Sequence, residues 1–401
     1  MFEKLRAATA LCITLALAAC GGGGGSGGIV NDTKGALKID SLLHVPNIGT
    51  TTNFSFDLGD IDSANNRYYF TDRNNKSVDV FDTRTNMLVA QITGGFAGVG
   101  ASADQSGPDG VNVIPNSNFI YVGDVNSVKI IDKRTNLVTK TIAVSSAGFR
   151  ADEGCFDADD NIFMSSSPGD DPPFATFIST TSQTVIAKLN FPGAAGLEQC
   201  AYDPGTKSFL VNNDGTTANA HGEVDVISAA SVLAGAPVVS AAYPLGNCDP
   251  TGLALGPGVD VAVECRPGTP GSALNLQILD RTNGKLLGVV SAGGGDQITY
   301  DPVSNRYYVA ENRLTASGLS VAACTAATPC TPVIAIVDAA SRKLIGRITA
   351  GNNAHSVAVD GPNRRVYVPF SSTAAPGGCP AGCDLFGTGE GGVAVYSIGG
   401  G

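Results

Sequence analysis

Residues 109–144, DGVNVIPNSNFIYVGDVNSVKIIDKRTNLVTKTIAV, carry the pattern that decides the fold. This stretch contains four short apolar runs, at 111–113, 119–122, 128–131 and 138–142, separated by turn-forming Asn, Pro, Asp and Gly residues. Apolar and polar residues that alternate between such turns are typical of antiparallel strands joined by short connections. The stretch therefore predicts a small sheet of four strands.

The same four-strand unit recurs along the chain in seven copies. Their first strands begin near residues 57, 109, 152, 198, 253, 296 and 355. Because stacked repeats share one core, the seven copies predict one body rather than several domains. The seventh copy ends after three strands, and residues 36–45, ALKIDSLLHV, supply a candidate for the fourth. In this candidate strand we expect Leu37, Ile39 and Leu43 to form one alternating face.

We therefore predict an all-β fold, a seven-bladed β-propeller closed by an N-terminal strand, over residues 36–401. Closure protects sheet edges that an open array would expose. Three segments, YVGD at 121–124, YVAEN at 308–312 and VYVP at 366–369, resemble the YVTN-type propeller repeat of bacterial and archaeal envelope proteins. The resemblance covers about residues 36–397, and it implies blades rather than a particular chemistry.

The first 19 residues have the features of an export signal. Lys4 and Arg6 precede an apolar run, residues 7–19, that is short for a membrane span. The run leads into LAAC at 17–20, which resembles the bacterial lipobox. That resemblance implies that Cys20 is lipidated on its thiol and becomes the first mature residue. The alternative is a plain signal peptide in which Cys20 is incidental.

Residues 21–28, GGGGGSGG, have almost no side chains to pack, so we expect a flexible tether. The predicted organisation is a lipoprotein signal peptide at 1–19, the lipidated Cys20 and Gly-rich tether at 20–35, and the propeller at 36–401. Gly21 follows the lipidated cysteine, which by the same resemblance favours the outer membrane of the bacterial cell envelope.

Composition narrows the range of partners. The formal net charge is −11, and only 15% of the residues are charged. An acidic surface argues against nucleic acid and against a basic membrane-binding patch. We expect a monomer that is held at the membrane by its lipid and has an envelope protein as its partner.

The cysteine count fits an oxidising compartment. Of ten cysteines, Cys12 lies in the export signal and Cys20 in the lipobox, which leaves an even number in the mature fold. Spacing favours four disulfides without proving the connectivity: Cys155–Cys200, Cys248–Cys265, Cys324–Cys330 and Cys379–Cys383.

Six residues share one register, just before the first strand of their units: Asp57, Asp109, Asp152, Glu198, Asp296 and His355. In a propeller these positions converge at one mouth of the central channel. Such a ring of acids should raise some pKa values, hold a cation or recruit Arg. Three interpretations stay open, namely turn caps, a structural cation and a catalytic metal site. Oxygen ligands suit calcium or magnesium, and His355 would admit zinc or manganese.

Loops between the second and third strands open on the same face. They supply candidate ligand-binding residues: Arg73, Asn74, Asn312 and Arg313. The two longest loops, at about 314–332 and 371–392, each contain a predicted disulfide. They are either a recognition surface or tolerated insertions.

Four other acids end a third strand directly before a turn: Asp82, Asp132, Asp280 and Asp338. Their side chains can accept hydrogen bonds from the backbone of the turn itself. We predict that they have this structural role and lie outside any functional site.

Two function classes follow. The first is a non-catalytic, lipid-anchored binding or scaffold module of the cell envelope. The alternative is a metal-dependent hydrolase or lyase, similar in plan to propeller lactonases and lyases whose metal lies at the channel mouth. Under that alternative Asp57, Asp296 and His355 would bind the metal, and Arg73 or Arg313 would hold an anionic substrate. The chain departs from those families because it lacks their Asn ligands.

Overall fold

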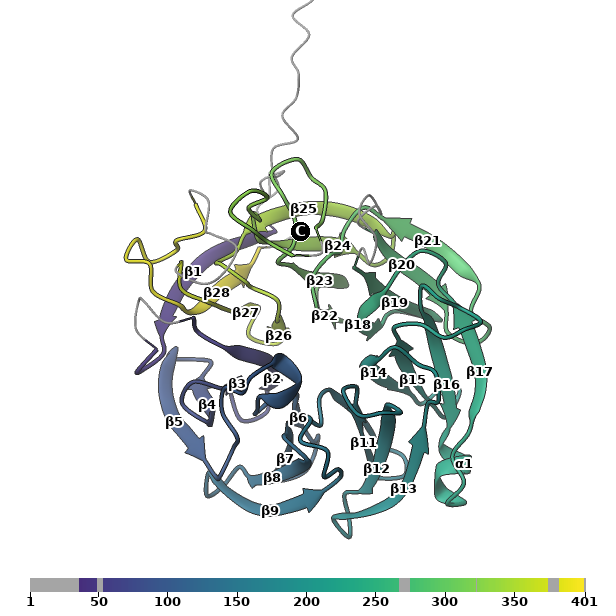
Figure 1. Cartoon of the computed structure of the whole chain (residues 1–401). Coiled ribbons are helices and arrows are strands. Elements are labelled where there is room, and N and C mark those ends of the chain that lie inside the picture. Colours follow the sequence, from purple (N-terminus) through teal and green to yellow (C-terminus); the bar gives the residue numbers. More distant parts are fainter. Residues whose placement is uncertain (1–35, 49–52, 267–274, 322, 374–381, 400–401) are drawn as a thin grey trace, which may run out of the picture.

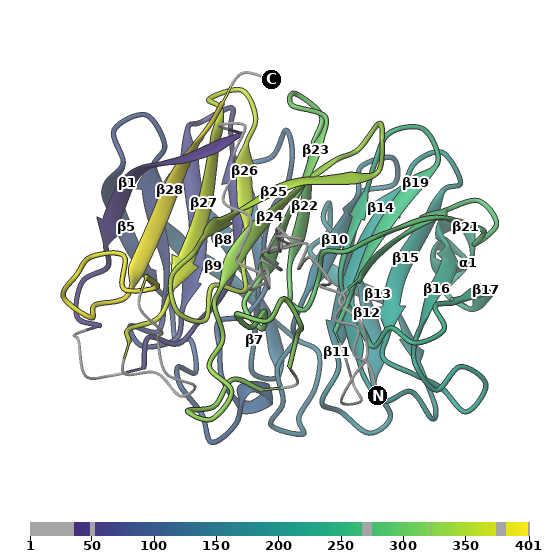
Figure 2. The ribbon, with the colours of Figure 1, turned by 90° about the horizontal axis from the view of Figure 1, so that it is seen from above.

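The structure is a computed structural model that describes residues 36–48, 53–266, 275–321, 323–373 and 382–399. These residues form seven four-stranded antiparallel sheets around a central axis (Figure 1). Seen from the side, the strands run between two opposite faces that carry the connecting loops (Figure 2). The predicted seven-bladed β-propeller is confirmed. The predicted signal peptide, Cys20 and the tether lie outside the described residues.

Each blade is one sheet, ordered from the axis to the rim. Blade 1 contains β2 (Phe56–Asp62), β3 (Arg67–Asp72), β4 (Ser77–Asp82) and β5 (Met87–Thr93). Blade 2 contains β6 (Val111–Val113), β7 (Phe119–Asp124), β8 (Ser127–Asp132) and β9 (Leu137–Ala143). Blade 3 contains β10 (Gly154–Asp157), β11 (Ile162–Ser167), β12 (Phe174–Ser179) and β13 (Thr184–Asn190). Blade 4 contains β14 (Leu197–Asp203), β15 (Ser208–Asn213), β16 (Glu223–Ser228) and β17 (Val239–Pro244).

The remaining blades follow the same plan. Blade 5 contains β18 (Pro250–Leu255), β19 (Asp260–Cys265), β20 (Asn275–Asp280) and β21 (Leu286–Val290). Blade 6 contains β22 (Ile298–Asp301), β23 (Arg306–Glu311), β24 (Val333–Asp338) and β25 (Lys343–Thr349). Blade 7 contains β26 (Ala358–Asp360), β27 (Arg365–Phe370), β28 (Gly392–Ile398) and β1 (Leu37–His44). Two short helices, η1 (Ala103–Gln105) and α1 (Ala229–Leu233), lie in connections. Within the described residues no helix has the length and hydropathy needed to cross a bilayer.

The ring closes where the N-terminal strand pairs with the C-terminal one. β1 runs antiparallel to β28, from Leu37 opposite Ile398 to His44 opposite Gly392. Leu37 and Leu43 are buried as predicted, but Ile39 is 37% exposed. The prediction of one alternating face was wrong, because the pairing register shifts between residues 39 and 41 and Leu37 and Leu43 pack in different clusters, Leu37 with Tyr396 and Leu43 with Val393. An irregularity of this kind interrupts the alternation of inward and outward side chains.

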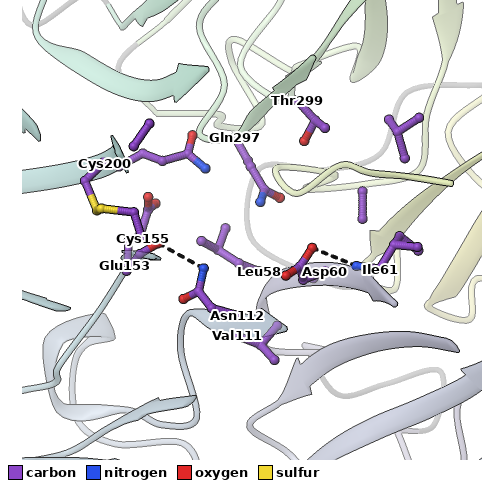
Figure 3. A pocket seen from close by; sticks show the side chains of 16 residues that line it. Leu58, Asp60, Ile61, Val111, Asn112, Glu153, Cys155, Cys200, Gln297 and Thr299 are labelled. Atoms are coloured by element: carbon purple, nitrogen blue, oxygen red, sulfur yellow. Dashed lines mark hydrogen bonds between the residues drawn. A yellow bond between two sulfur atoms is a disulfide. The ribbon is translucent and has the colours of Figure 1, made fainter. Parts of the chain in front are cut away.

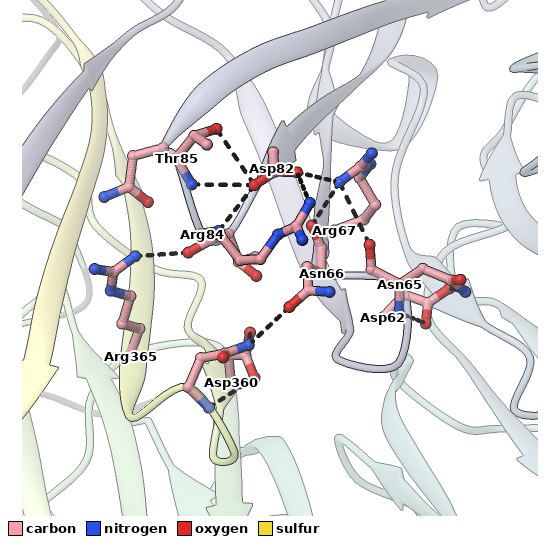
Figure 4. A network of polar contacts seen from close by, with 12 residues as sticks. Asp62, Asn65, Asn66, Arg67, Asp82, Arg84, Thr85, Asp360 and Arg365 are labelled. Atoms are coloured by element: carbon pink, nitrogen blue, oxygen red, sulfur yellow. Dashed lines mark hydrogen bonds and ion pairs between the residues drawn. The ribbon is translucent and has the colours of Figure 1, made fainter.

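Turn chemistry shapes the loops on the face opposite the mouth. Asp82 accepts hydrogen bonds from the backbone N–H groups of Arg84 (2.9 Å) and Thr85 (3.0 Å), and Figure 4 shows this turn. Nearby, the Arg365 guanidinium of blade 7 donates to the Thr83 carbonyl at 2.6 Å and so supports the closure of the ring. The predicted capping role is confirmed for all four acids: Asp82, Asp132, Asp280 and Asp338.

Neighbouring blades are joined along the central channel. Polar side chains of one inner strand bond to the backbone of the next blade: Asp60 Oδ2 with Val113 N (2.8 Å), Asn112 Nδ2 with Gly154 O (2.9 Å), Gln199 Oε1 with Leu253 N (2.8 Å) and Gln297 Oε1 with Val357 N (2.9 Å). Between blades 3 and 4 the Cys155–Cys200 disulfide makes the connection instead. These links fix the starts of the inner strands relative to one another.

Three of the four predicted disulfides are confirmed: Cys155–Cys200, Cys248–Cys265 and Cys324–Cys330. The first joins blades 3 and 4, the second joins the segment before β18 to the end of β19, and the third closes a short loop after β23. The fourth predicted pair, Cys379–Cys383, involves Cys379, which lies outside the described residues, and stays a prediction.

Candidate functional site: the charged mouth of the propeller

One end of the central channel opens into a cavity of about 250 Å³. We call it the mouth cavity, and its lining comes from six of the seven blades: Asp57, Arg73, Ala103, Arg150, Asp152, Glu153, Glu198, Arg266, Asp296, Asn312, Arg313, Asn353 and His355. Five of the six residues predicted from their shared register therefore meet in one place. The sixth, Asp109, is fully buried and is held by an ion pair with Arg73.

Arg73 joins the first strands of blades 1 and 2. It follows β3 directly, in a turn where Asp72 Oδ1 accepts a hydrogen bond from Asn75 N at 2.9 Å. Its guanidinium Nη2 lies 3.1 Å from Asp57 Oδ2 and also contacts Asp109 Oδ1. All three side chains are at least nine-tenths buried, so their charges are weakly screened.

Arg150 has the same role between blades 2 and 3, and the sequence analysis missed it. Its Nη2 lies 2.7 Å from Asp152 Oδ2, and its Nη1 lies 3.5 Å from Asp109 Oδ1. The sequence did hold one signal that could have found Arg150: it stands two residues before Asp152, an acid of the shared register. The ring of acids was expected to raise some pKa values, hold a cation or recruit Arg. In the half of the mouth formed by blades 1–3, the acids recruit two arginines, Arg73 and Arg150. Among the described residues, no backbone N–H donates to the Asp57, Asp109 or Asp152 carboxylates, so they do not cap turns.

Five side chains in this half of the mouth influence one another's protonation strongly: Asp57, Arg73, Asp109, Arg150 and Asp152. Burial alone would raise the pKa of Asp57, but the charge of Arg73, the hydrogen bond and charge of His355 and the charge of Arg150 lower it below its ordinary value. Burial raises the pKa of Asp152 to about 7, although Arg150 and Arg73 oppose the shift. Groups coupled this closely titrate as a set rather than one by one.

In the half of the mouth cavity formed by blades 4–6, the acidic and basic side chains are less closely paired. Arg266 Nη2 lies 3.6 Å from Glu198 Oε1, a loose pair. Burial and the positive charge of Arg266 lower the pKa of Arg313. Within the described part of the chain, neither the Arg313 guanidinium nor the Asp296 carboxylate has a hydrogen bond or an ion pair with another side chain. These two groups remain free to contact a ligand.

His355 presents one ring nitrogen to this cavity. Its Nδ1 lies 2.7 Å from the Asn353 carbonyl oxygen, which only accepts, so Nδ1 carries the proton in the neutral ring. The ring stacks on Phe56, with centroids 4.5 Å apart, and Nε2 lies 3.8 Å from Asp57 Oδ1. Asp57, Asp296 and His355 each offer one potential ligand atom, and these three atoms lie within 4.8 Å of one another. This trio has the spacing of a metal site, whereas the acids of the other trio, Asp57, Asp109 and Asp152, are already paired with Arg73 or Arg150.

The predicted ligand-binding residues divide into two groups. Arg73, Asn312 and Arg313 line the mouth cavity. Asn74 is not in its lining, because its amide holds the adjacent loop: Oδ1 accepts from Ser55 N at 2.7 Å and Nδ2 donates to Asn53 O at 3.3 Å. The lining also includes five residues that the sequence analysis did not assign to the site: Ala103, Arg150, Glu153, Arg266 and Asn353.

Solved structures with little sequence similarity share this fold. One is a chain titled Kuenenia stuttgartiensis hydrazine synthase, with 15% identity and a TM-score of 0.63, where the alignment covers 88% of this chain and 98% of that one. Another belongs to a mitotic checkpoint complex, with 12% identity, a TM-score of 0.59 and coverage of 98% and 97%. The likeness shows the fold alone. No protein-family model matches the chain, and no curated protein matches its sequence.

Behind the mouth lies a second cavity of about 320 Å³, which we call the channel cavity (Figure 3). Its walls combine apolar side chains, the Cys155–Cys200 disulfide and a few polar groups, among them Asp60 and Asn112. Burial raises the pKa of Asp60 to about 6, although the backbone N–H groups of Val113 and Ile61 oppose the shift. Glu153 lines both cavities and therefore lies at the neck between them.

Proposed function

We propose that this protein is a lipid-anchored envelope propeller that binds a charged ligand or partner at its mouth. The observation that supports the proposal is the mouth cavity, in which Arg73 and Arg150 are already paired while Asp296 and Arg313 are not. Groups held by ion pairs and packing need little reorganisation when a ligand arrives, and this favours binding. The fold itself is consistent with a binding or scaffold module.

The location part of the proposal rests on the sequence of the first 28 residues. The LAAC segment and the Gly-rich stretch predict a lipid on Cys20 and a tether long enough to separate the lipid from the propeller. The resemblance of the blades to the YVTN-type repeat supports the same compartment. An envelope protein then becomes the natural partner for the loops around the mouth.

Cys20→Ala should abolish membrane anchoring without altering the propeller. We expect an unprocessed precursor or a soluble periplasmic form, because the acyl acceptor is gone. Fractionation and fatty-acid labelling measure the effect, with Cys12→Ala as a matched control that removes a thiol within the same signal. A Cys20→Ala protein that still labels with fatty acid and pellets with membranes contradicts the anchor.

A second candidate function is a metal-dependent hydrolase or lyase. The observation that favours it is the convergence of Asp57, Asp296 and His355 within 4.8 Å. The available Nε2 lone pair of His355 and two carboxylates form a ligand set suited to zinc or manganese. Against it, Asp57 already shares its charge with Arg73 at 3.1 Å, which weakens its donation to a metal.

A chelator test decides whether the mouth cavity holds a metal ion, which the second function requires. A divalent ion that binds only the folded state raises the melting temperature by mass action. If these residues hold one, a chelator should lower the melting temperature of the wild type and leave an Asp296→Asn, His355→Ala double variant unchanged. The turn-capping acid Asp132 provides the matched control, since Asp132→Asn should keep the response of the wild type. A wild-type protein that does not respond to chelator or to added zinc, manganese, calcium or magnesium contradicts the metal site.

A further inference from the structure

Glu153 occupies the neck between the mouth cavity and the channel cavity. Its side chain projects from the segment that leads into β10, and only 4% of the residue is exposed. Figure 3 shows it among the side chains around the channel cavity, together with Asn112, Asp60 and Gln297. A ligand that reaches from one cavity into the other must pass this carboxyl group.

The Glu153 carboxyl has no partner in the described part of the chain. Its Oε2 is buried without a hydrogen bond, and neither oxygen forms an ion pair. After burial, the strongest influences on this group are the negative charges of four other acids: Asp152, Glu198, Asp296 and Asp57. A buried carboxyl group in this position is unfavourable unless a proton or a positive ligand accompanies it.

Comparison of the blades shows that the side chain at this position links neighbouring blades in three of the other six blades. In each unit it directly follows the register of Asp57, Asp109 and their counterparts. Gln199 and Gln297 occupy it in blades 4 and 6 and bond to the backbone of the next blade at 2.8 and 2.9 Å. Ser356 occupies it in blade 7 and accepts a hydrogen bond from Gly59 N at 3.1 Å. In blade 3 the Cys155–Cys200 disulfide joins the next blade, so Glu153 is not needed for that task.

The surroundings indicate an organic cation rather than a metal ion. Metal ions require several donor atoms that converge, and neither group of potential ligands with that spacing contains Glu153. Behind the neck, the walls include the apolar side chains of Leu58, Val111 and Val359. A second carboxylate, Asp60, lies in the same cavity. An aliphatic chain with an ammonium group at each end matches this alternation of acidic and apolar lining.

We propose that the neck and channel cavity bind a linear aliphatic diamine, with one ammonium group at Glu153 and the other near Asp60. The hydrocarbon between them packs against Leu58, Val111 and Val359. An ammonium group supplies the donors and the positive charge that the Glu153 carboxyl lacks. This inference deepens the proposed binding function and rests on it.

Calorimetric titration with 1,4-diaminobutane at pH 8 and low salt tests the proposal. We expect saturable binding to the wild type and at least a tenfold loss of affinity in Glu153→Gln. This variant should fold, because Gln already occupies the same position in blades 4 and 6. Asp132→Asn removes the same charge from a turn-capping acid that lines neither cavity, and it should bind as the wild type does.

Three results would overturn the proposal. The first is a wild type that does not bind the diamine, the second is equal binding by the wild type and Glu153→Gln, and the third is equal binding of uncharged 1-butanol. Saturable binding of calcium or magnesium chloride that is lost in Glu153→Gln would assign the neck to an inorganic cation and overturn it too. Failure of the lipid anchor in the proposed function has a different signature, because the Cys20→Ala fractionation is independent of Glu153.

Discussion

Deleting residues 36–45 should leave the propeller without a stable folded monomer. These residues contain β1, which supplies the fourth strand of blade 7, and Leu37 and Leu43 of this strand and Val45 directly after it are 5% exposed or less. Burial of an aliphatic side chain contributes about 1.5–3 kcal/mol, so the three together account for about 5–9 kcal/mol. The free energy of unfolding of a whole domain is only about 5–15 kcal/mol. The deletion also exposes the edge of β28, which could then pair with another chain.

Denaturant unfolding and size-exclusion chromatography with light scattering measure the result. We expect the deletion variant to unfold at a much lower denaturant concentration, or to elute as larger species. Ile39→Ala in the otherwise complete chain is the matched control, because Ile39 belongs to the same strand but is 37% exposed. Exposed substitutions of this kind usually change stability by about 0.5 kcal/mol or less. A deletion variant that remains monomeric with an unchanged midpoint contradicts the role of β1 in closure.

The sequence was sufficient for the architecture because the repeat itself carries the information. The chain contains seven units in which apolar and polar residues alternate, and one unit lacks a strand. Few arrangements fit this pattern other than a ring closed by residues 36–45. The register argument also brought Asp57, Asp152, Glu198, Asp296 and His355 to one mouth, because it depends only on where the inner strands begin. Features that depend on single side chains were harder to predict. The register shift at residues 39–41, which sends Leu37 and Leu43 to different clusters, is one of them.

The arginine side chains that neutralise the acids of the mouth were also hard to predict from the sequence. Arg73 was predicted as a ligand-binding residue, but its guanidinium lies between two acids of the ring. Arg150 enters the mouth from an irregular segment before β10, where no strand periodicity marks which side it faces. Glu153 did leave a signal in the sequence, since Gln199 and Gln297 occupy the same position in other units. Only the structure shows that those two are bonded to the next blade while Glu153 is not.

Arg73→Met should lower the free energy of unfolding by about 3–5 kcal/mol at pH 8, the usual result of removing one partner from a buried ion pair. The substitution keeps most of the side-chain volume but removes the charge next to Asp57 and Asp109, which are 6% and 0% exposed. Both carboxylates would then be buried with less compensation, and Arg150, 3.5 Å from Asp109, is the nearest remaining cation. Denaturant titration at fixed pH measures the loss.

The pH dependence of that loss identifies its cause. In the wild type the pKa of Asp57 is lowered, so its contribution to stability is present above the ordinary pKa of about 3.9 and is lost as the pH falls through the folded value. Without Arg73, burial should instead raise the pKa of Asp57, so the penalty is greatest at high pH and fades as the carboxyl takes up a proton. The difference between the two proteins should therefore shrink from pH 8 to pH 4.

Two further variants separate charge from packing. Asp109→Asn in the Arg73→Met background should recover part of the lost stability at pH 8, because burial already raises the pKa of Asp109 and an amide at this position does not carry the charge that burial disfavours. Arg84→Met is the matched surface control: Arg84 pairs with Asp82 at 3.3 Å, but its side chain is 64% exposed, and an exposed pair contributes about 0–1 kcal/mol. A loss in Arg73→Met that is the same at pH 4 and pH 8, and that Asp109→Asn does not relieve, would mean that packing rather than charge makes Arg73 important.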